Sequence, residues 1–510
     1  MPYISGGGYP NSPVTTVDVG MVHAGCPPSP TLSAMPEDTM RARVSLAVML
    51  PYWGFWESSA DGAAFRSDRR DLLHEEVERL ESAGVDVGWS GMGVSPEAGA
   101  DAAEEIRATD AQVLVVAQSM AVPPTHAMAA LDRLGDLPVV VWAVQRDRTL
   151  GSGFDQSDIT TMGATVGTPM LTNLLVRSGR PFELVVGGIS EEPAVEKLVR
   201  TVGAAAVARS LVSARIARVG RPIDGYACVD VDDEDLKAAT GIELIPVDPT
   251  EIQTLYQEVS DVAGLEAELV GRYEDVTEDR EGRTRSMRLA AAVEELDRAR
   301  NFDAGAMNCH VAEIRFADEP GVTPCFGIGR ETTRGVPWTC AGDVLTAVAM
   351  LVAKRLGGAA LYHEIEAIDF DTGEVAIANS GEHDLGWCGR GARPRLQPNP
   401  WYQSDRITGI SAWFELPPGP ATLVGFTPHH DEPSGFRLIA AEGEITARSF
   451  PDSPTVGGAF RFAGGEPVAE AWRRWALAGA NHHSAAAPGS LAAEVGVVAR
   501  YLRIGFARVS

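Results

Sequence analysis

Residues 44–53 read VSLAVMLPYW, and residues 71–84 read DLLHEEVERLESAG. The first segment is a continuous apolar run of strand length. The second repeats apolar residues at the spacing of one helical face and ends in a glycine. The alternation recurs in AQVLVVAQS (111–119) and PVVVWAV (138–144), with helical segments between them. Apolar strands that alternate with amphipathic helices indicate a parallel sheet covered on both faces. The pattern therefore predicts a doubly wound α/β domain over residues 43–168.

A second series of strands and helices occupies residues 169–356. It includes the apolar segments PFELVVGG (181–188) and GIELIPVD (241–248). Between about Glu251 and Arg300 the chain is rich in Glu and Arg, which is typical of a solvated helix surface. This series predicts a second doubly wound parallel α/β domain.

The character of the chain changes over residues 357–510. Short alternating segments such as EIEAIDFDTGEVAIANSG (364–381) and ISAWFELPPGPATLVGF (410–426) are separated by Gly, Pro and Asp turns. They predict an antiparallel β domain of barrel or sandwich type, followed by terminal helices. At the other end, residues 1–42 are rich in Gly, Pro, Ser and Thr. They form an N-terminal arm without a core of its own, for which both disorder and a strap against a neighbouring subunit stay open.

Charge and cysteine content narrow the class of protein. The chain carries 43 Lys and Arg against 70 Asp and Glu, a formal net charge of −27. This balance argues against a nucleic-acid or membrane partner, although a local basic pocket for a phosphorylated or sulfonated substrate stays open. The six cysteines contain no CxxC pair, which is typical of thiols in a reducing compartment. The sequence shows no membrane-spanning run and no signal-peptide pattern, so we expect a cytoplasmic location.

Three short motifs combine histidine with carboxylates or with a second histidine. They are Glu382-His383-Asp384, the run from His429 to Glu432, and the pair His482-His483. Imidazole and carboxylate groups together suit a divalent ion such as Mn²⁺. Each motif alone is more typical of exposed polar side chains than of a ligand set, but the three together in one domain leave both interpretations open.

Three longer segments carry a family resemblance. AWRRWALAGANHHSAAAPGSLAAEVGVVARYLRIGFARV (471–509), GVPWTCAGDVLTAVAMLVAKRLGG (335–358) and LYHEIEAIDFDTGEVAIANSGEHD (361–384) resemble the L-arabinose and L-fucose isomerase family. The resemblance implies an isomerase that interconverts an aldose and a ketose through an enediol. It also implies a divalent metal, usually Mn²⁺, a small carbohydrate substrate and a homo-oligomer, either a trimer or a hexamer.

The family's metal ligands are matched only in part. The resemblance places the second acidic ligand on Glu364 and the C-terminal histidine ligand on His483 or on its neighbour His482. Two positions depart from the family pattern, because Ala341 stands where the first acidic ligand is expected and Asn379 stands where a histidine is expected. This chain is therefore a divergent member by its sequence.

The departure has two interpretations: a site rebuilt with other residues, or loss of metal catalysis. We favour a rebuilt site, because histidines and carboxylates lie beside the altered positions. The resulting hypothesis takes Glu364, His483, His383 and Glu382 as metal ligands, with Glu364 and Asp343 as catalytic groups. Asp343 stands where a helix begins, so an N-cap also explains it.

Substrate contacts are predicted for His310, Trp338, His383 and His482. Packing in the core is the competing interpretation for Trp338, and Cys340 is better explained as a packed apolar residue than as a nucleophile. Two alternative functions are kept: an epimerase or lyase acting on a modified sugar at the rebuilt site, and a sugar-binding protein without catalysis.

Overall fold

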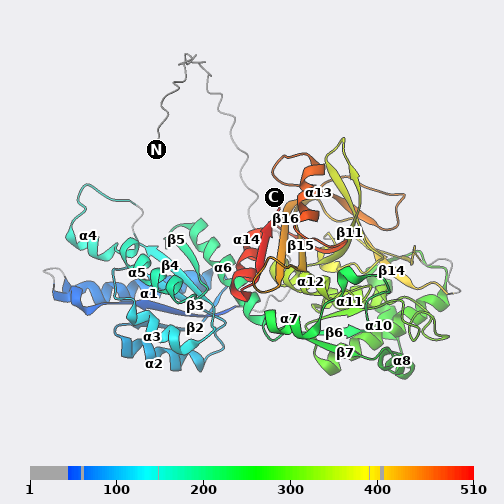
Figure 1. Ribbon diagram of the computed structural model, residues 1–510, viewed down its shortest axis with the longest axis horizontal. Helices are drawn as coiled ribbons and strands as arrows, with labels where there is room; N and C mark the ends of the chain where they lie inside the picture. The colour runs from blue at the N-terminus through cyan, green and yellow to red at the C-terminus, as the bar shows by residue number, and fades with distance from the viewer. Residues whose placement is uncertain (1–43, 59–61, 147–148, 390, 402–406, 510) are drawn as a thin grey trace, which may run out of the picture. The chain divides into compact units, whose positions relative to one another are not determined.

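The computed structural model describes residues 44–58, 62–146, 149–389, 391–401 and 407–509. Figure 1 labels many of their helices and strands. The N-terminal arm predicted for residues 1–42 lies outside the described residues. In the described ranges, no helix is long and apolar enough to cross a membrane.

The first sheet consists of five parallel strands in the order β2-β1-β3-β4-β5. The central strands β3 and β4 are buried almost throughout, whereas exposed and half-buried residues alternate along most of the edge strand β2. This explains the continuous apolar runs in the sequence, because central strands of a covered parallel sheet are apolar on both faces. The elements of this part are β1 (Ser45–Pro51), η1 (Gly54–Ser58), η2 (Gly62–Ala64), α1 (Phe65–Ser82), β2 (Asp86–Gly93), α2 (Pro96–Arg107), β3 (Val113–Gln118), α3 (Thr125–Leu134), β4 (Val139–Gln145), α4 (Gln156–Thr161), α5 (Ala164–Arg177), β5 (Glu183–Gly188) and α6 (Glu192–Leu211).

Strand β5 belongs to the first sheet, although it lies beyond residues 43–168, the segment that the sequence assigns to the first domain. It pairs with β4 without a break in register, from Val140 opposite Glu183 to Gln145 opposite Gly188. Order along the chain suggests that this segment opens the second domain, but tertiary pairing places it at the edge of the first sheet. The boundary between residues 168 and 169 stays a prediction.

The second sheet is also parallel and has the strand order β10-β9-β6-β7. The chain passes from β6 to β7 on one side and returns to β9 on the other side of β6, so the strand order reverses between β6 and β9. In open parallel sheets, ligands bind beyond the carboxyl ends of the strands at such a reversal. The elements are β6 (Arg215–Val219), η3 (Ala227–Val229), α7 (Asp233–Thr240), β7 (Glu243–Val247), α8 (Pro249–Glu258), α9 (Ala263–Arg272), α10 (Arg280–Arg300), β9 (Ala304–Met307), α11 (Cys325–Arg334), β10 (Trp338–Thr339) and α12 (Val344–Gly357).

The charged stretch that the sequence presents as one helical surface divides into α8, α9 and α10. Side chains of Asp261 and Asp279 accept hydrogen bonds from the backbone N–H groups of Ala263 and Gly282. Asp279 is the N-cap of α10, whereas Asp261 precedes the N-cap Val262 and binds the first amide of α9. The aspartates therefore start α9 and α10 as separate helices.

The C-terminal part is a closed antiparallel barrel of the strands β15, β18, β11, β12, β17 and β16, in which β16 pairs back with β15. Closure pairs both edges of every barrel strand. With the two parallel sheets, it confirms the predicted fold class. The elements are β11 (Leu361–Asp369), β12 (Glu374–Ala378), η4 (Leu385–Trp387), β15 (Gly419–Pro428), β16 (Phe436–Ile445), β17 (Val456–Phe462), α13 (Val468–Leu477), β18 (His483–Pro488), α14 (Ala492–Leu502) and β19 (Gly505–Arg508), beside a small sheet of β14 (Ile410–Trp413), β13 (Arg395–Pro398) and β8 (Glu274–Asp275).

Helix α12 connects the second sheet to the barrel, because it contacts β9 on one side and β15 and β18 on the other. Nearly all of its residues are buried, as expected for a helix that is apolar all round. Asp343 caps its N-terminus by accepting a hydrogen bond from the backbone N–H of Thr346 at 2.8 Å. The start of α12 is therefore fixed at the junction of sheet and barrel.

A buried carboxyl group in α1 makes the stability of the fold dependent on pH. Glu76 is 0% exposed, and neither of its side-chain oxygens has a hydrogen-bond partner among the described residues. Burial raises the pKa of Glu76 from its ordinary value of 4.5 to about 8. Between these two values the unfolded chain loses this proton while the folded chain keeps it, so the free energy of unfolding falls as the pH rises.

We expect Glu76→Gln to stabilise the protein more at pH 8 than at pH 5, because the substitution removes this titration. The effect at pH 7 is on the order of 3 kcal/mol. Thermal melts of wild type and variant at the two pH values test this, with the exposed Glu78→Gln on the same helix as the control. A difference in melting temperature that is the same at both pH values would contradict it.

Candidate functional site

Three loops that follow parallel strands of the second sheet meet the start of barrel strand β18. The loops after β6 and β9 lie on the two sides of the strand-order reversal, and the loop after β10 leads into α12. The hydrogen bonds that connect these segments run from Asn308 Nδ2 to Arg221 O (2.7 Å), from Ile223 N to Ala341 O (3.3 Å) and from Asn481 Nδ2 to Cys228 O (3.2 Å). The strand ends and the barrel therefore form one continuous polar region.

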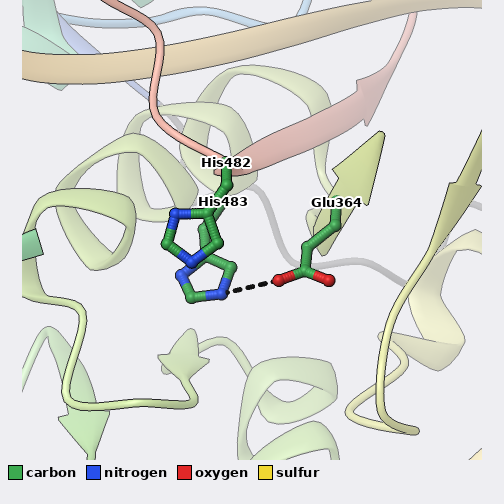
Figure 2. Close-up of side chains that lie close together, drawn as sticks. All are labelled: Glu364, His482 and His483. Carbon is green, nitrogen blue, oxygen red and sulfur yellow. Dashed lines mark ion pairs between the residues drawn. The ribbon is translucent and has the colours of Figure 1, made fainter. Parts of the chain in front are cut away.

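Glu364 and His483 face each other across two neighbouring barrel strands. They are paired in the antiparallel register of β11 and β18. The His483 Nε2 atom lies 2.9 Å from a carboxylate oxygen of Glu364, as Figure 2 shows. The two residues that the resemblance names as a carboxylate ligand and an imidazole ligand are thus in direct contact.

Asp343 holds the other side of the His483 ring. Its carboxylate lies 2.9 Å from His483 Nδ1 and also accepts hydrogen bonds from the backbone N–H and the hydroxyl of Thr346. A carboxylate on one ring nitrogen fixes the ring's orientation and directs the other nitrogen to the site. Burial would lower the pKa of His483, but the hydrogen bonds to Asp343 and Glu364 outweigh it and raise the pKa to about 9. The N-cap predicted for Asp343 is therefore observed, and the same carboxylate contacts His483.

His482 lies against His483, with ring centroids 3.7 Å apart (Figure 2). Its Nδ1 atom is 2.8 Å from the side-chain oxygen of Asn481. One ligand atom from each of Glu364, His482 and His483 lies within 4.8 Å of the others. The sequence places the two histidines between helices, whereas the structure makes His483 the first residue of β18. This strand is what brings them to Glu364.

The turn from Cys340 to Asp343 has an unusual backbone. Ala341 has a φ of 58° and is buried, a conformation that is rare and strained for a residue with a side chain. At Gly342, with a φ of 73°, a Cβ atom would lie 3.0 Å from the carbonyl oxygen of Arg221 in the β6 loop. The turn is therefore closely packed against that loop, and at Ala341 it offers only a methyl group where the resemblance expects a carboxylate.

The segment from Asn379 to Asp384 is anchored at both ends. The Asn379 side chain donates to Tyr362 O at 3.1 Å and accepts from Gly381 N at 2.8 Å. Gly381 has a φ of 111°, and a Cβ atom there would lie 2.1 Å from a side-chain atom of β14. At the other end, Asp384 forms a buried ion pair with Lys354 at 2.6 Å. The asparagine that replaces the family's histidine therefore shapes the turn that leads to Glu382.

Glu382 is the unexplained group in this anchored segment. It is fully buried, and no hydrogen bond of standard geometry from any described residue reaches either carboxylate oxygen. Burial raises its pKa to about 8, while the charge of Glu364 raises it and that of His483 lowers it. Glu382 lies outside the group of ligand atoms within 4.8 Å of one another. A buried polar group without a partner requires a reason, and a bound ligand is one.

The structure places His383 away from Glu364 and His483. Its ring packs edge-on against Phe414, with centroids 5.0 Å apart. Burial lowers the pKa of His383 to about 3, and a backbone contact at Ala412, too poor in geometry to count as a hydrogen bond, offsets this only in part. His383 and Glu382 are consecutive residues with different surroundings. The charges of His483 and Glu364 shift the pKa of Glu382, whereas the pKa of His383 is set by its burial.

The two remaining predicted substrate contacts have different surroundings. Trp338 is 0% exposed and donates from its indole nitrogen to Asp297 at 2.9 Å, so it belongs to the core of the second sheet. This packing keeps its ring from lining an open pocket. His310 is exposed in the loop after β9, with Nε2 at 3.3 Å from a guanidinium nitrogen of Arg315. Of these two residues, His310 is therefore the one that lies at the strand-order reversal with an accessible side chain.

Two further residues of the site escape the sequence analysis. Glu366 follows Glu364 by two positions on β11; partial burial and the neighbouring carboxylate of Glu364 raise the pKa of the exposed Glu366. The E-x-E spacing on a strand is a signal that could have found it. Tyr226, in the β6 loop, presents its ring to His482 at 5.2 Å and His483 at 6.3 Å. No local pattern marks it, since the contact arises from tertiary packing.

The second histidine cluster is a poorer cation site. Ligand atoms of His429, His430 and Asp431 also lie within 4.8 Å of one another. However, a guanidinium nitrogen of Arg437 lies 2.9 Å from His429 Nε2. A positive charge at this position opposes the binding of a cation. We therefore place the candidate site at Glu364, His482 and His483.

Known sugar isomerases are similar to this chain over part of its length. No family model matches the chain. It is 26% identical to the sulfoquinovose isomerases of Priestia aryabhattai and Priestia megaterium over 316 residues, which is 60% of this chain and 66% of each relative. It is 25% identical to the L-arabinose isomerase of a Nocardioides species over 336 residues, covering 63% of this chain and 65% of that protein. The matched region is thus slightly less than two thirds of the length of these relatives.

These similarities indicate a class of protein and not a particular reaction. The chain is a distant homologue of aldose–ketose sugar isomerases. The distant homology to sulfoquinovose isomerases and to an L-arabinose isomerase confirms the resemblance seen in its sequence.

Proposed function

We propose that this protein is a metal-dependent isomerase that interconverts an aldose and a ketose through an enediol. The observation that carries the proposal is the line of Asp343, His483 and Glu364, in which a buried imidazole is held on one side by a carboxylate and directed at a second carboxylate on the other. Distant homology to sugar isomerases supports the class of reaction.

The donor set fits a divalent cation. One carboxylate and two imidazoles come within 4.8 Å of one another, and such oxygen and nitrogen donors suit Mn²⁺. We propose Glu364 and His483 as ligands, with His482 beside them. The buried carboxyl group of Glu382 has no hydrogen-bond partner among the described residues, and on ionisation it would supply the second negative charge that Ala341 lacks. When bound, such an ion polarises a sugar carbonyl and lowers the pKa of the neighbouring hydroxyl.

The remaining side chains would orient the ring and move the proton. Asp343 has all its hydrogen bonds committed to Thr346 and His483, so it acts as a positioning residue. Glu366 is exposed to solvent, and burial and the neighbouring Glu364 raise its pKa. A carboxyl group with a raised pKa holds a proton more readily and can both donate and accept one. Glu366 is therefore our candidate for moving the proton between the two sugar carbons.

We further propose that the substrate is a sugar with an acidic substituent. Two of the similar proteins are named for sulfoquinovose, a sulfonated sugar. The loops at the strand-order reversal carry two cations: Arg315 lies beside His310, and the exposed guanidinium of Arg221 lies 3.5 Å from Asp230. In a chain with a net charge of −27, cations at this position favour an anionic substrate over a neutral one.

The experiment that tests the function combines a panel of sugars with Mn²⁺. Neutral pentoses and hexoses, uronic acids, phosphosugars and sulfoquinovose are incubated with the protein in D₂O, with Mn²⁺ or with EDTA, and followed by NMR. We expect exchange of the C2 proton and a ketose product from an acidic sugar, only with Mn²⁺. Exchange with a different product would favour an epimerase or lyase. A changed reaction would agree with the altered positions Ala341 and Asn379, where the resemblance expects a carboxylate and a histidine. Binding without exchange would contradict an enzymatic role.

A further inference from the structure

Two cysteine thiols lie in contact beside the proposed site. Cys309 follows β9 and Cys340 follows the adjacent parallel strand β10. Their sulfur atoms are 3.2 Å apart, and the thiol of Cys340 donates a hydrogen bond to the sulfur of Cys309. The residues are 1% and 7% exposed. The reaction proposed above uses neither thiol.

The geometry suits a disulfide bond. By the register of β9 and β10, Cys340 lies level with Met307 and Cys309 lies two residues further along, so the two cysteines meet through their side chains just beyond the strand ends. The sulfurs would have to approach by only about 1 Å to reach bonding distance. The third buried thiol nearby, Cys325, instead accepts a hydrogen bond from the side-chain amide of Asn399 at 3.2 Å. The contact between Cys309 and Cys340 is therefore a specific pair.

We propose that Cys309 and Cys340 form an oxidation site at which a hydroperoxide converts the two thiols into a reversible disulfide. The Cys309 sulfur attacks one oxygen of hydrogen peroxide; an S–O bond forms, the O–O bond breaks, and the leaving oxygen takes up the thiol proton as water. The Cys340 sulfur then attacks the Cys309 sulfenic acid; the S–S bond forms, the S–O bond breaks, and a second water leaves with the Cys340 proton. The two thiols lose two electrons, and the peroxide gains them. A dithiol reverses the reaction by exchange.

The bond would act on the turn that positions His483. Cys340 is separated from Asp343 by Ala341 and Gly342 only, and Ala341 already has a strained backbone. Drawing Cys340 toward Cys309 displaces this turn, and with it the carboxylate on His483 Nδ1. Loss of such an outer partner lowers metal affinity about 10–100-fold. This consequence rests on the proposed function, whereas formation of the disulfide does not.

The test begins with mapping of the disulfide. The full-length protein is treated with hydrogen peroxide, unreacted thiols are alkylated under denaturing conditions, and tryptic peptides are identified by mass spectrometry. Residues 301–315 and 335–354 each form one tryptic peptide with a single cysteine. We expect these two peptides to be cross-linked after oxidation and separated by dithiothreitol. Cys325→Ser should behave as wild type, and neither Cys309→Ser nor Cys340→Ser should give this cross-link.

The second part compares Mn²⁺ binding by the reduced and the oxidised protein in thermal shift titrations. We expect the oxidised protein to bind Mn²⁺ at least about tenfold more weakly, and dithiothreitol to restore the affinity. Absence of the cross-linked peptide, or its formation with Cys325 instead, would overturn the oxidation site. A disulfide that leaves Mn²⁺ affinity unchanged would overturn its effect on the site. If the reduced protein binds no Mn²⁺, the proposed function fails, while the peptide map still decides on the oxidation site.

Discussion

Replacing Glu364 by glutamine is expected to lower the affinity for Mn²⁺ by about 100-fold or more, together with the isomerase activity. The substitution keeps the size of the side chain but removes the negative charge that faces His483 Nε2 at 2.9 Å. Loss of an outer partner of a metal ligand already lowers affinity about 10–100-fold, and Glu364 is proposed as a ligand itself. Isothermal titration with Mn²⁺ measures the affinity, and C2 proton exchange measures the activity.

The control for Glu364→Gln is Glu444→Gln in barrel strand β16. Glu444 is exposed and paired with Arg461, so its loss should change neither Mn²⁺ affinity nor exchange. A Glu364→Gln protein that binds Mn²⁺ as tightly as wild type would exclude Glu364 from the metal site. The pairing of Glu364 with His483 would then have only a structural role.

The second large effect is expected for Glu382→Gln, which should lower Mn²⁺ affinity about 10–100-fold while the protein stays folded. Glu382 is completely buried and has no hydrogen bond to either oxygen among the described residues, so glutamine removes a carboxyl group that can ionise on metal binding and breaks no hydrogen bond of the side chain there. Its anchors at Asn379 and Asp384 are unaffected. The rebuilt site needs this charge because Ala341 has no carboxylate. An effect of this size is typical for groups that support a metal centre.

Glu331→Gln is the matched control for Glu382→Gln. Glu331 is also buried in the second domain, and burial raises its pKa to about 7, but it pairs with arginines of α11. We expect Glu331→Gln to leave Mn²⁺ binding unchanged. If Glu382→Gln also binds Mn²⁺ like wild type while Glu364→Gln does not, Glu382 is only a buried carboxyl group. The site would then have to function without a second carboxylate.

The fold class could be predicted from the sequence because hydrophobic periodicity reports local structure directly. The apolar run around Val48 and the alternating segments after Glu364 give parallel and antiparallel strands as predicted. Pairing partners are set by tertiary contacts instead, so the sequence could not place Glu183–Gly188 at the edge of the first sheet. The predicted oligomer, the cytoplasmic location and the domain boundaries stay predictions.

The candidate site could be predicted only where a motif or the resemblance marks a residue. Glu364 and His483 were found in this way, and the register of β11 and β18 brings them together. The sequence could not decide between a substrate contact and a core position for Trp338, because an aromatic ring fits a sugar pocket and a core equally well. The structure shows it in the core. The contact between Cys309 and Cys340 joins residues 31 positions apart, and no local pattern encodes it.

The most direct test of the metal site is anomalous diffraction from crystals soaked in Mn²⁺, recorded on both sides of the manganese absorption edge. We predict an anomalous peak in contact with the Glu364 carboxylate and His483 Nε2, with the Glu382 carboxylate turned toward it and Asp343 still bonded to His483 Nδ1. A peak confined to His429 and His430, or no peak at all, would contradict the assignment of this site.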